Sequence, residues 1–241
     1  MSTIQLKNLV YEVPNKRILS NVNLEIESGE VVSIMGQSGS GKTTLLKLMT
    51  GLVKPTSGQI LIGDTDIATL SENELDKMRL KMGLVFQYAA LFDSLTVYEN
   101  IVFGVVRNQK KKPRAELDSI VKKLLSQVRL EGIEQQYPSQ LSGGMQKRVG
   151  LARALAVEPS IVFYDEPTSG LDPVTCTVID DLILETRQKF GVTSVVVSHH
   201  VPSVLRISDR VAMLDQGEIV AYATPEELRK DPNPVVQAFV A

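Results

Sequence analysis

The hydrophobic positions along the chain form two kinds of pattern. Short continuous runs rich in β-branched residues occur at Val31–Met35, Ile161–Tyr164, Ser194–Ser198 and Arg210–Leu214. Such runs are typical of parallel strands that are buried on both faces. In contrast, apolar residues between Ala115 and Leu130 recur with a helical period, which predicts an amphipathic helix. Strands and helices alternate, and we therefore expect an α/β fold with a mostly parallel core sheet.

Weaker patterns complete the outline of a single domain. The first 30 residues predict an antiparallel β subdomain with turns at Pro14-Asn15 and Ser28-Gly29. Further strands are expected at residues 59–62, 83–87 and 218–221, and helices at 43–49, 71–82 and 225–229, the last followed by a Pro-rich tail. Ser71, with Glu74 three residues later, predicts the start of the second helix. The mostly helical character between the core segments 1–87 and 159–241 predicts a helical insertion at residues 88–158.

Composition narrows the class of protein without identifying it. The chain has 241 residues, of which 43% are hydrophobic and 22% charged, as in an ordinary soluble globular domain. A net charge of −2 gives no general reason to expect nucleic acid. The single cysteine, Cys176, excludes an internal disulfide and fits a reducing compartment. No stretch approaches 18 apolar residues, so we expect another chain to supply any membrane-spanning part.

Residues 36–44 carry the strongest chemical signal. They match the Walker A pattern G-x-x-x-x-G-K-[ST], between a predicted strand and a predicted helix. Glycines let the backbone bend around an anion, and the helix that follows offers its positive end to the same anion. Lys42 supplies a charge for the β- and γ-phosphates, and the Thr43 hydroxyl suits Mg²⁺. The predicted nucleotide-binding residues of this loop are Gly36, Gln37, Ser38, Gly39, Ser40, Gly41, Lys42, Thr43 and Thr44.

The run Ile161–Glu166 predicts a strand that ends in two acids. Asp165 is placed to bind Mg²⁺ beside Thr43, and Glu166 is placed to polarise an attacking water. Without the Walker A loop, a buried strand ending in a charged turn would remain an alternative. With that loop upstream, the pair predicts a site that hydrolyses ATP.

A second phosphate-binding helix start is predicted at Leu141–Gln146. Ser142 is a good N-cap, and Gly143 and Gly144 let the first N–H groups approach a phosphate closely. The Walker A loop already occupies the phosphates of its own site, so this motif needs a second nucleotide. The simplest arrangement is a head-to-tail pair of copies, in which each chain completes the other's site.

These motifs, in this order, resemble the ATP-binding cassette family of P-loop ATPases over nearly the whole chain. The resemblance implies ATP and Mg²⁺ as ligands and Lys42, Glu166 and His199 as catalytic residues. It places Gln87 in the Q-loop, where it contacts Mg²⁺ or the water and reports to a membrane partner. It also places Asp172 in the D-loop at the dimer interface. The implied metal ligands are Thr43, Gln87 and Asp165.

Three positions depart from the family pattern. Met145 replaces the commoner Gln of the signature motif, and His200 follows the switch histidine, where the family usually has an acid. Many members stack the adenine on an aromatic residue, but Val13 occupies that position here, with Tyr11 two residues earlier. We therefore expect Val13 to contact the base by apolar packing and His199, rather than His200, to act.

The segment after the Q-loop indicates the partner. In the resembling family, residues here receive a coupling helix of a membrane permease, so we expect docking near residues 88–101 and exposure of Leu91, Phe92 and Leu95. The run Ala90–Thr96, together with Met145, His200 and the C-terminal tail, is similar to the ATPases of Mla/Mce phospholipid-trafficking systems. The resemblance implies a peripheral subunit on the cytoplasmic face of the inner membrane.

Several alternatives stay open at this stage. The basic run Arg107–Arg114 is either a solvated loop or a site for an anionic membrane face or an acidic partner. The whole chain could instead be a cassette that regulates a membrane complex mechanically, or an importer subunit for another substrate. Two other classes of protein fit the sequence less well. A cassette that acts on nucleic acid usually carries two cassettes or long coiled coils. A small-molecule kinase has no use for the Ser142 motif. A metal held by His199 and His200 lacks a third ligand.

Overall fold

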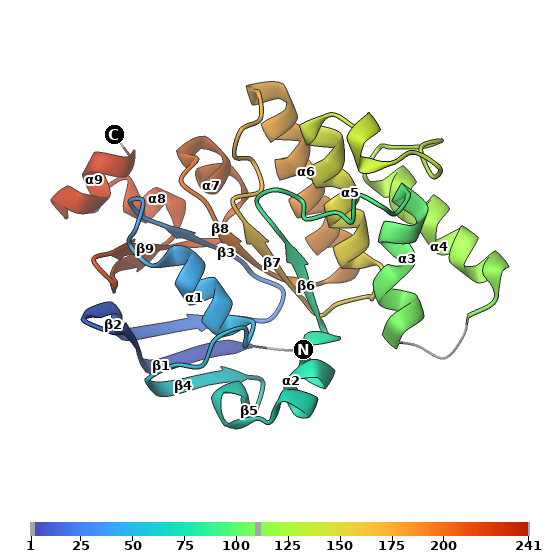
Figure 1. Cartoon of the computed structure of the whole chain (residues 1–241). Coiled ribbons are helices and arrows are strands. Elements are labelled where there is room, and N and C mark those ends of the chain that lie inside the picture. The colour runs from blue at the N-terminus through green and yellow to red at the C-terminus, as the bar shows by residue number, and fades with distance from the viewer. Residues whose placement is uncertain (1–2, 109–111, 241) are drawn as a thin grey trace.

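The computed structural model describes residues 3–108 and 112–240, which form two sheets and surrounding helices (Figure 1). The core sheet has the strand order β10-β9-β3-β8-β7-β6. Its strands are β3 (Val31–Met35), β6 (Met82–Val85), β7 (Ile161–Asp165), β8 (Thr193–Val197), β9 (Arg210–Asp215) and β10 (Glu218–Ala223). All neighbours pair in parallel except β9 and β10. The predicted, mostly parallel α/β core is therefore confirmed.

Central strands of this sheet are buried along their whole length, as their uninterrupted apolar sequences predict. Every residue of β3 and β8 is buried. The sheet brings the carboxyl ends of β3, β7 and β8 to one edge, where each is followed by a predicted functional motif. The strand predicted at 83–87 ends at Val85, and Gln87 lies in the turn beyond it.

The second sheet is antiparallel, with the order β2-β1-β4-β5. It contains β1 (Ile4–Val13), β2 (Lys16–Ile26), β4 (Ser57–Ile62) and β5 (Thr65–Asp66). The predicted β1–β2 turn is confirmed, and Asn15 adopts the left-handed conformation there with φ 66°. Helix α1 (Lys42–Met49) lies between the two sheets, and its buried leucines share one hydrophobic cluster with residues of both. This packing fixes the start of α1 beside β2.

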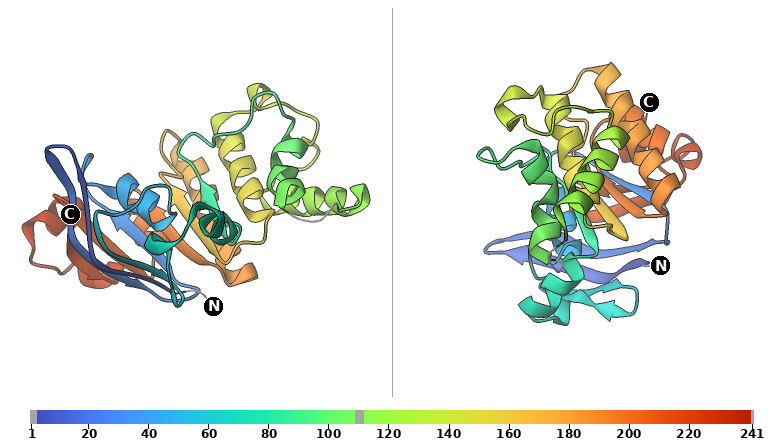
Figure 2. Two further views of the ribbon diagram at one scale, coloured as in Figure 1. Left: turned by 60° about the horizontal axis from the view of Figure 1, so that its bottom comes forward. Right: turned by 90° about the vertical axis from the view of Figure 1, so that its right-hand side faces the viewer.

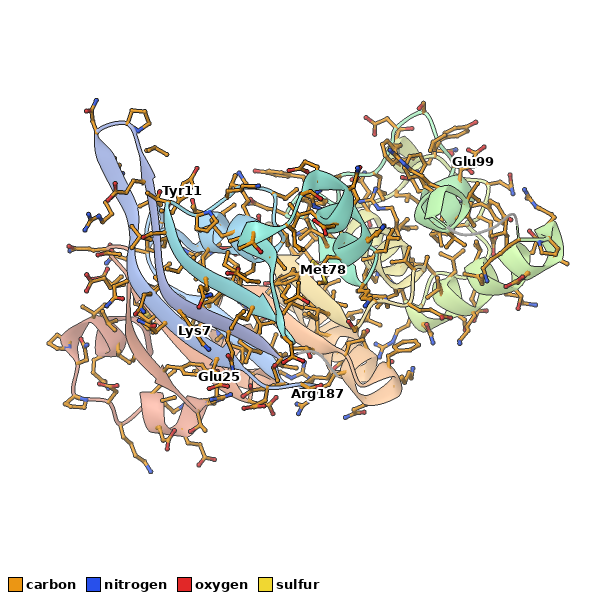
Figure 3. The ribbon with its side chains drawn as sticks, turned by 90° about the horizontal axis from the view of Figure 1, so that it is seen from below. Lys7, Tyr11, Glu25, Met78, Glu99 and Arg187 are labelled. Atoms are coloured by element: carbon orange, nitrogen blue, oxygen red, sulfur yellow. The ribbon has the colours of Figure 1, made fainter. Side chains whose placement is uncertain are left out.

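A mostly helical segment extends from one end of the sheets (Figure 2). Its helices are α3 (Val97–Asn108), α4 (Arg114–Gln127) and α5 (Gly143–Leu155), with a 3-10 turn at Pro138–Gln140. They share a hydrophobic cluster with α6 (Pro173–Phe190). Figure 3 shows Glu99 of α3 at the opposite end of the molecule from Lys7 and Tyr11 of β1. The division at residues 88 and 158 stays a prediction.

Among the remaining helices, α2 and α8 were predicted and differ near their ends, whereas α7 and α9 were not predicted. Helix α2 (Glu72–Arg79) follows a 3-10 turn at Ile67–Thr69 and has the predicted Ser71–Glu74 capping box, but it ends three residues early. Helices α7 (Val201–Ile207) and α8 (Pro225–Leu228) follow β8 and β10. The expected Pro-rich tail forms a further helix, α9 (Pro234–Val240), anchored by the fully buried Val236. No helix within residues 3–108 and 112–240 is long and apolar enough to cross a bilayer.

Candidate functional site

The loop between β3 and α1 closes tightly at both ends because glycine occupies its crowded positions. A Cβ on Gly36, whose φ is 153°, would lie 2.0 Å from the carbonyl oxygen of Leu214. A Cβ on Gly41, whose φ is 108°, would lie 2.8 Å from Leu19 Cδ2. Gly41 directly precedes α1, so the positive end of that helix faces the loop. An anionic phosphate fits this arrangement.

Lys42 extends back along the inside of the loop. Its side chain is largely buried, and Nζ donates hydrogen bonds to the carbonyl oxygens of Gly36 at 2.7 Å and Gln37 at 2.8 Å. Burial lowers the pKa of Lys42, and the nearby carboxylates of Glu166 and Asp165 oppose that shift. The ammonium group is therefore held inside the curve of the loop, where phosphate oxygens would meet it.

Two acids at the end of β7 face the start of α1. Thr43 Oγ1 donates a hydrogen bond to Asp165 Oδ1 at 3.5 Å, which joins α1 to β7. Burial raises the pKa of Asp165, and the adjacent charge of Glu166 raises it further. A hydroxyl and a carboxylate at this distance are hard oxygen donors of the type that Mg²⁺ prefers. A bound cation would also relieve the repulsion between the two acids, so these residues fit Mg²⁺.

Glu166 is held in an unusual backbone conformation, with φ 49°. Its amide donates to the carbonyl of Val197 on β8, and its Oε2 accepts from His199 Nδ1 at 2.8 Å. Because a non-glycine residue with positive φ is strained, the surrounding structure must hold this geometry in place. The His199–Glu166 contact joins the turn after β7 to the loop after β8.

These motifs surround a cavity of about 770 Å³. Its predicted lining residues are Gly36, Gln37, Ser38, Gly39, Gly41, Lys42, Thr43, Thr44, Gln87, Glu166 and His199. Ile18 and Phe239 line it as well, and the sequence patterns gave no sign of either. Gln87 Nε2 donates to Ser169 Oγ at 3.4 Å, so the Q-loop and the D-loop meet at its edge.

Six predicted nucleotide-binding residues do not line this cavity, and neither does the predicted metal ligand Asp165. Val13, which was expected to contact the base, is 39% exposed at the end of β1, whereas Ile18 of β2 lines the cavity. Ser40 is buried within the loop. Asp172 caps α6 by accepting hydrogen bonds from the amides of Val174 and Thr175, each at 3.0 Å. The other three are Ser142, Gly143 and Gly144.

The start of α5 has the predicted capped geometry. Ser142 Oγ accepts a hydrogen bond from the amide of Met145 at 3.3 Å. A Cβ on Gly143 would meet no atom within 4 Å, whereas a Cβ on Gly144 would lie 2.7 Å from Thr175 Cγ2 of α6. The second glycine therefore serves packing inside this chain, and the first leaves the helix start open to an approaching group.

Sequence reasoning missed the lysine that ties these loops together. Lys147 of α5 is 7% exposed, and its Nζ donates to the carbonyl oxygen of Ser169 at 2.5 Å and that of Glu166 at 3.4 Å. It thereby connects α5 to the D-loop and to the strained turn at Glu166. A lysine four residues into a helix has no signal of its own, because helical lysines are usually solvated.

Comparison with known proteins identifies related sequences. The family described as ABC transporter matches residues 19–169. The methionine import ATP-binding protein MetN of Carboxydothermus hydrogenoformans is 40% identical over 241 residues, covering 98% of this chain and 71% of MetN. The intermembrane phospholipid transport system ATP-binding protein MlaF of Escherichia coli K12 is 39% identical over 237 residues, covering 98% of this chain and 88% of MlaF.

Solved structures that are similar to this chain include an ATP-binding cassette. The ATP-binding cassette MJ0796, in a dimeric structure of a post-hydrolysis state bound to ADP and Pi, superposes with a TM-score of 0.85. The two sequences are 36% identical, and the match covers 92% of this chain and 98% of that one. A sequence identity of this level over nearly the whole of both chains indicates a family relationship and not only a shared fold.

Proposed function

The chain belongs to the ABC transporter family, as an ATP-binding subunit that hydrolyses ATP, and we propose that it drives phospholipid movement through a separate membrane permease. ATP and Mg²⁺ are the ligands of such cassettes, and the cavity beside the Walker A loop fits both. The substrate is the finer part of the proposal, because relatives of similar identity are named for methionine and for phospholipid.

The residues of the cavity supply the chemistry of hydrolysis in this proposal. The glycine loop and the start of α1 bind the triphosphate, and Lys42 lies where it neutralises the β- and γ-oxygens. Glu166 orients the attacking water and accepts its proton. His199, held by Glu166 at 2.8 Å, stabilises the developing charge on the γ-phosphate. Gln87 contributes from the Q-loop at the cavity's edge.

Mg²⁺, when bound, supplies positive charge between the phosphate oxygens. Thr43 and Asp165 would hold it, with Gln87 as a third candidate from the same cavity. Of these, Thr43 and Asp165 are already in contact with each other. Asp165 also has the raised pKa expected of a partly buried carboxylate beside a second acid.

A second copy of the chain completes each site in this proposal. Ser142, Gly143 and Gly144 do not line the cavity of their own chain, although their helix start is capped and open. In a head-to-tail pair they would contact the γ-phosphate bound by the partner. The dimeric structures of MJ0796 support this arrangement. Asp172, on the loop before α6, would lie at the same interface.

A groove beside the Q-loop supports docking of the permease. It has a volume of about 620 Å³ and contains Leu80, Phe86, Phe92, Phe103 and Arg153 among its lining residues. The groove extends beyond the predicted segment 88–101 to α2. Of the three predicted apolar contacts, Phe92 is exposed, and Leu91 and Leu95 are partly exposed. Leu91 packs against the hydrophobic core. An apolar segment of a membrane protein would fill such a surface.

The run Ala90–Thr96 is the observation that carries the phospholipid assignment. Two of its residues, Ala90 and Phe92, line the groove beside the Q-loop, and the run resembles the corresponding segment of the Mla/Mce ATPases. The similarity to MlaF over 98% of this chain supports the same substrate class. Attachment to a permease would place the chain at the cytoplasmic face of the inner membrane, with the helical segment 88–158 as the subdomain nearest the permease.

Reconstitution with the co-purifying permease tests this assignment. The complex is placed in liposomes with a fluorescent phospholipid, and ATP-dependent lipid transfer is compared with uptake of radiolabelled methionine. We expect lipid transfer with the natural chain and none with Glu166→Gln, which serves as the matched control. ATP-dependent methionine uptake without lipid transfer would overturn the phospholipid assignment and leave the ATPase function intact. The mechanical-regulator hypothesis is not favoured, since these named relatives are transport proteins.

A further inference from the structure

Beyond the cavity, three polar residues form a buried chain of contacts behind the switch loop. His200 Nδ1 lies 2.8 Å from Ser203 Oγ, and that hydroxyl lies 2.8 Å from Asp180 Oδ2. Ser203 and Asp180 are each 3% exposed. His200 precedes α7, Ser203 lies in its first turn, and Asp180 belongs to α6. The chain of contacts therefore ties the residue after His199 to the helix that follows the D-loop.

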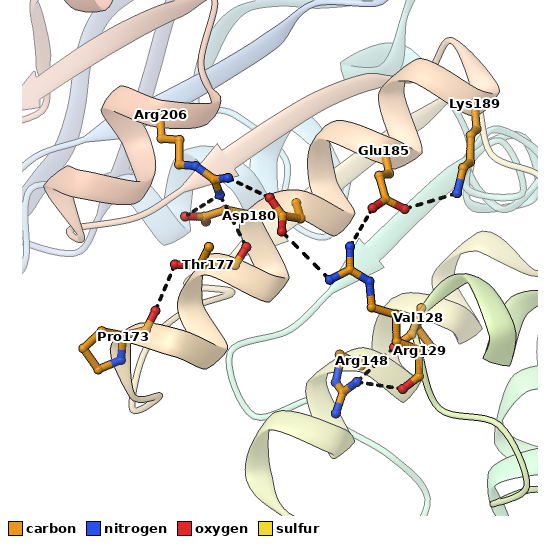
Figure 4. Close-up of polar contacts among 10 residues, drawn as sticks. Val128, Arg129, Arg148, Pro173, Thr177, Asp180, Glu185, Lys189 and Arg206 are labelled. Atoms are coloured by element: carbon orange, nitrogen blue, oxygen red, sulfur yellow. Dashed lines mark hydrogen bonds and ion pairs between the residues drawn. The ribbon is translucent and has the colours of Figure 1, made fainter.

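The charge of Asp180 decides which atoms carry the protons. The pKa of Asp180 is raised overall, chiefly by burial, and the hydrogen bond from Ser203 and the charge of Arg206 oppose this rise. Arg206 Nη1 lies 3.9 Å from Asp180 Oδ2, and Figure 4 shows this side chain reaching from α7 to α6. Arg206 also pairs with Asp181 at 2.7 Å. In the contact between the two side chains, Ser203 Oγ is the donor and Asp180 Oδ2 the acceptor.

A hydroxyl has a single proton, so the direction of the whole chain follows from that carboxylate. Ser203 must donate to Asp180, and its remaining lone pairs can only accept. His200 Nδ1 must therefore donate to Ser203, which requires a proton on Nδ1. The backbone fixes the same residue from the other side, because the His200 amide donates to Ser198 Oγ at 3.1 Å and its carbonyl accepts from Val204.

From this geometry we infer that His200 is a positioning residue, which donates from Nδ1 through Ser203 to Asp180 and so holds the switch loop with His199 facing Glu166. The inference rests on the proposed role of His199. It also explains how two adjacent histidines divide their tasks: the ring of His199 contacts Glu166 at 2.8 Å, and the ring of His200 is held behind the loop. Asp180 lies two helical turns beyond Asp172. The carboxylate that ends this chain of contacts therefore belongs to α6, the helix that follows the D-loop.

Proton placement on His200 is directly measurable, because the chain contains only two histidines. Protein labelled with ¹⁵N in its histidine rings is examined by long-range ¹H–¹⁵N NMR at neutral pH, and His200→Asn assigns the signals. We expect His200 in the Nδ1–H form. A neutral His200 protonated only on Nε2 would overturn the inference, whatever the ATPase activity shows.

Two amide substitutions separate the two ring nitrogens. His200→Asn places an amide near the position of Nδ1 and keeps a donor for Ser203, whereas His200→Gln places its amide near Nε2. We expect His200→Asn to retain most activity and His200→Gln to lower kcat by about tenfold with KM for ATP nearly unchanged, because the nucleotide contacts are intact and only the alignment is lost. Circular dichroism melting checks that both variants fold. The opposite ranking, at equal stability, would contradict the inference.

A double-mutant cycle tests whether His200 acts through His199. We expect His200→Gln to lower kcat in the natural chain but to have no further effect in His199→Ala, where nothing remains to be positioned. An equal loss in both backgrounds would mean that His200 acts independently and would overturn the inference. If His199→Ala itself retained full turnover, the proposed role of His199 would fail instead, so the two failures are distinguishable.

Discussion

Asp165 and Glu166 place two carboxylates next to each other at the end of a buried strand, and this pairing sets stability against function. Burial and the charge of Glu166 raise the pKa of Asp165, while the hydrogen bond from Thr43 and the charges of Lys47 and Lys42 oppose the shift. A raised pKa means that folding disfavours the charged form of this group. The site therefore stores a repulsion that a bound cation would relieve.

Asp165→Asn should stabilise the protein without ligands while abolishing turnover. The amide has no charge to desolvate, so we expect the melting temperature to rise by about 1–3 °C at neutral pH. Since the pKa is raised on folding, the stability cost of the carboxylate is full above the raised pKa. It disappears as the pH falls below 3.8, the ordinary pKa of this group. The gain should therefore vanish in acid. Melting curves from pH 7 to pH 3 measure it, and a loss of stability at neutral pH would contradict the electrostatic explanation.

Glu166→Gln should separate binding from hydrolysis. The amide preserves the shape of the side chain but accepts no proton from water, so we expect kcat to fall by about 10²–10⁴. ATP affinity should change little, because Lys42 and the glycine loop remain intact. Phosphate release and fluorescent-nucleotide titration measure the two quantities separately. Near-normal turnover would refute the role assigned to Glu166.

At the scale of elements, the start of α5 packs against α6 through its second glycine. A side chain at position 144 would have no room beside Thr175. One turn later, Lys147 donates hydrogen bonds to the carbonyl oxygens of Ser169 and Glu166. The helix that presents Ser142 is thus tied to the loops around its own chain's cavity. We therefore expect a movement of α5 to displace the loops at Ser169 and Glu166.

Gly143→Ala and Gly144→Ala form a matched pair that tests this packing. Both add one methyl group at the start of the same helix, but only the second meets Thr175. We expect Gly144→Ala to be less stable than Gly143→Ala by about 1–3 kcal/mol. Gly143→Ala should instead lower ATPase activity, because its methyl group would lie between the helix start and the partner's nucleotide. Urea unfolding and turnover assays measure both effects, and equal stabilities would argue against tight packing at Gly144.

The elements themselves were largely predictable, and the tertiary partners of isolated residues were not. Continuous apolar runs located the core strands because each is buried on both faces, and Ser71 and Glu74 located the start of α2 through local hydrogen bonds. The Walker A loop was predictable because its glycines have a steric role that few other residues can fill. Ile18, Lys147 and Phe239 reach the site only through the three-dimensional arrangement, and the helix α9 depends on burying Val236.

At the scale of the whole molecule, we propose that the two predicted phosphate-binding motifs of the chain serve different sites. The cavity brings together the motifs after β3, β6, β7 and β8, whereas the Ser142 loop stands outside it. In this proposal, a single chain holds one incomplete nucleotide site and one helix start that needs the nucleotide of a partner. Two copies related by a two-fold axis would complete both, which makes ATP the link between the subunits.

Ser142→Arg should block hydrolysis although the Walker A loop of the same chain is intact. The bulky cation would occupy the place of the partner's γ-phosphate contact, so we expect turnover to fall to background while ATP binding to the isolated chain persists. Sedimentation of the Glu166→Gln background with ATP should show a dimer that the added Ser142→Arg removes. A monomeric protein with full activity would contradict the arrangement.

Disulfide trapping between two separately purified chains tests the shared site most directly. One chain carries Ser38→Cys in the Walker A loop and the other carries Ser142→Cys, both in the Glu166→Gln background; the natural Cys176 is buried. With ATP, the mixture should form a crosslinked species of twice the chain mass, and either chain alone should form far less, as should the mixture with ADP. Absence of this crosslink at saturating ATP, or equal crosslinking without nucleotide, would show that the Ser142 loop does not complete the partner's site.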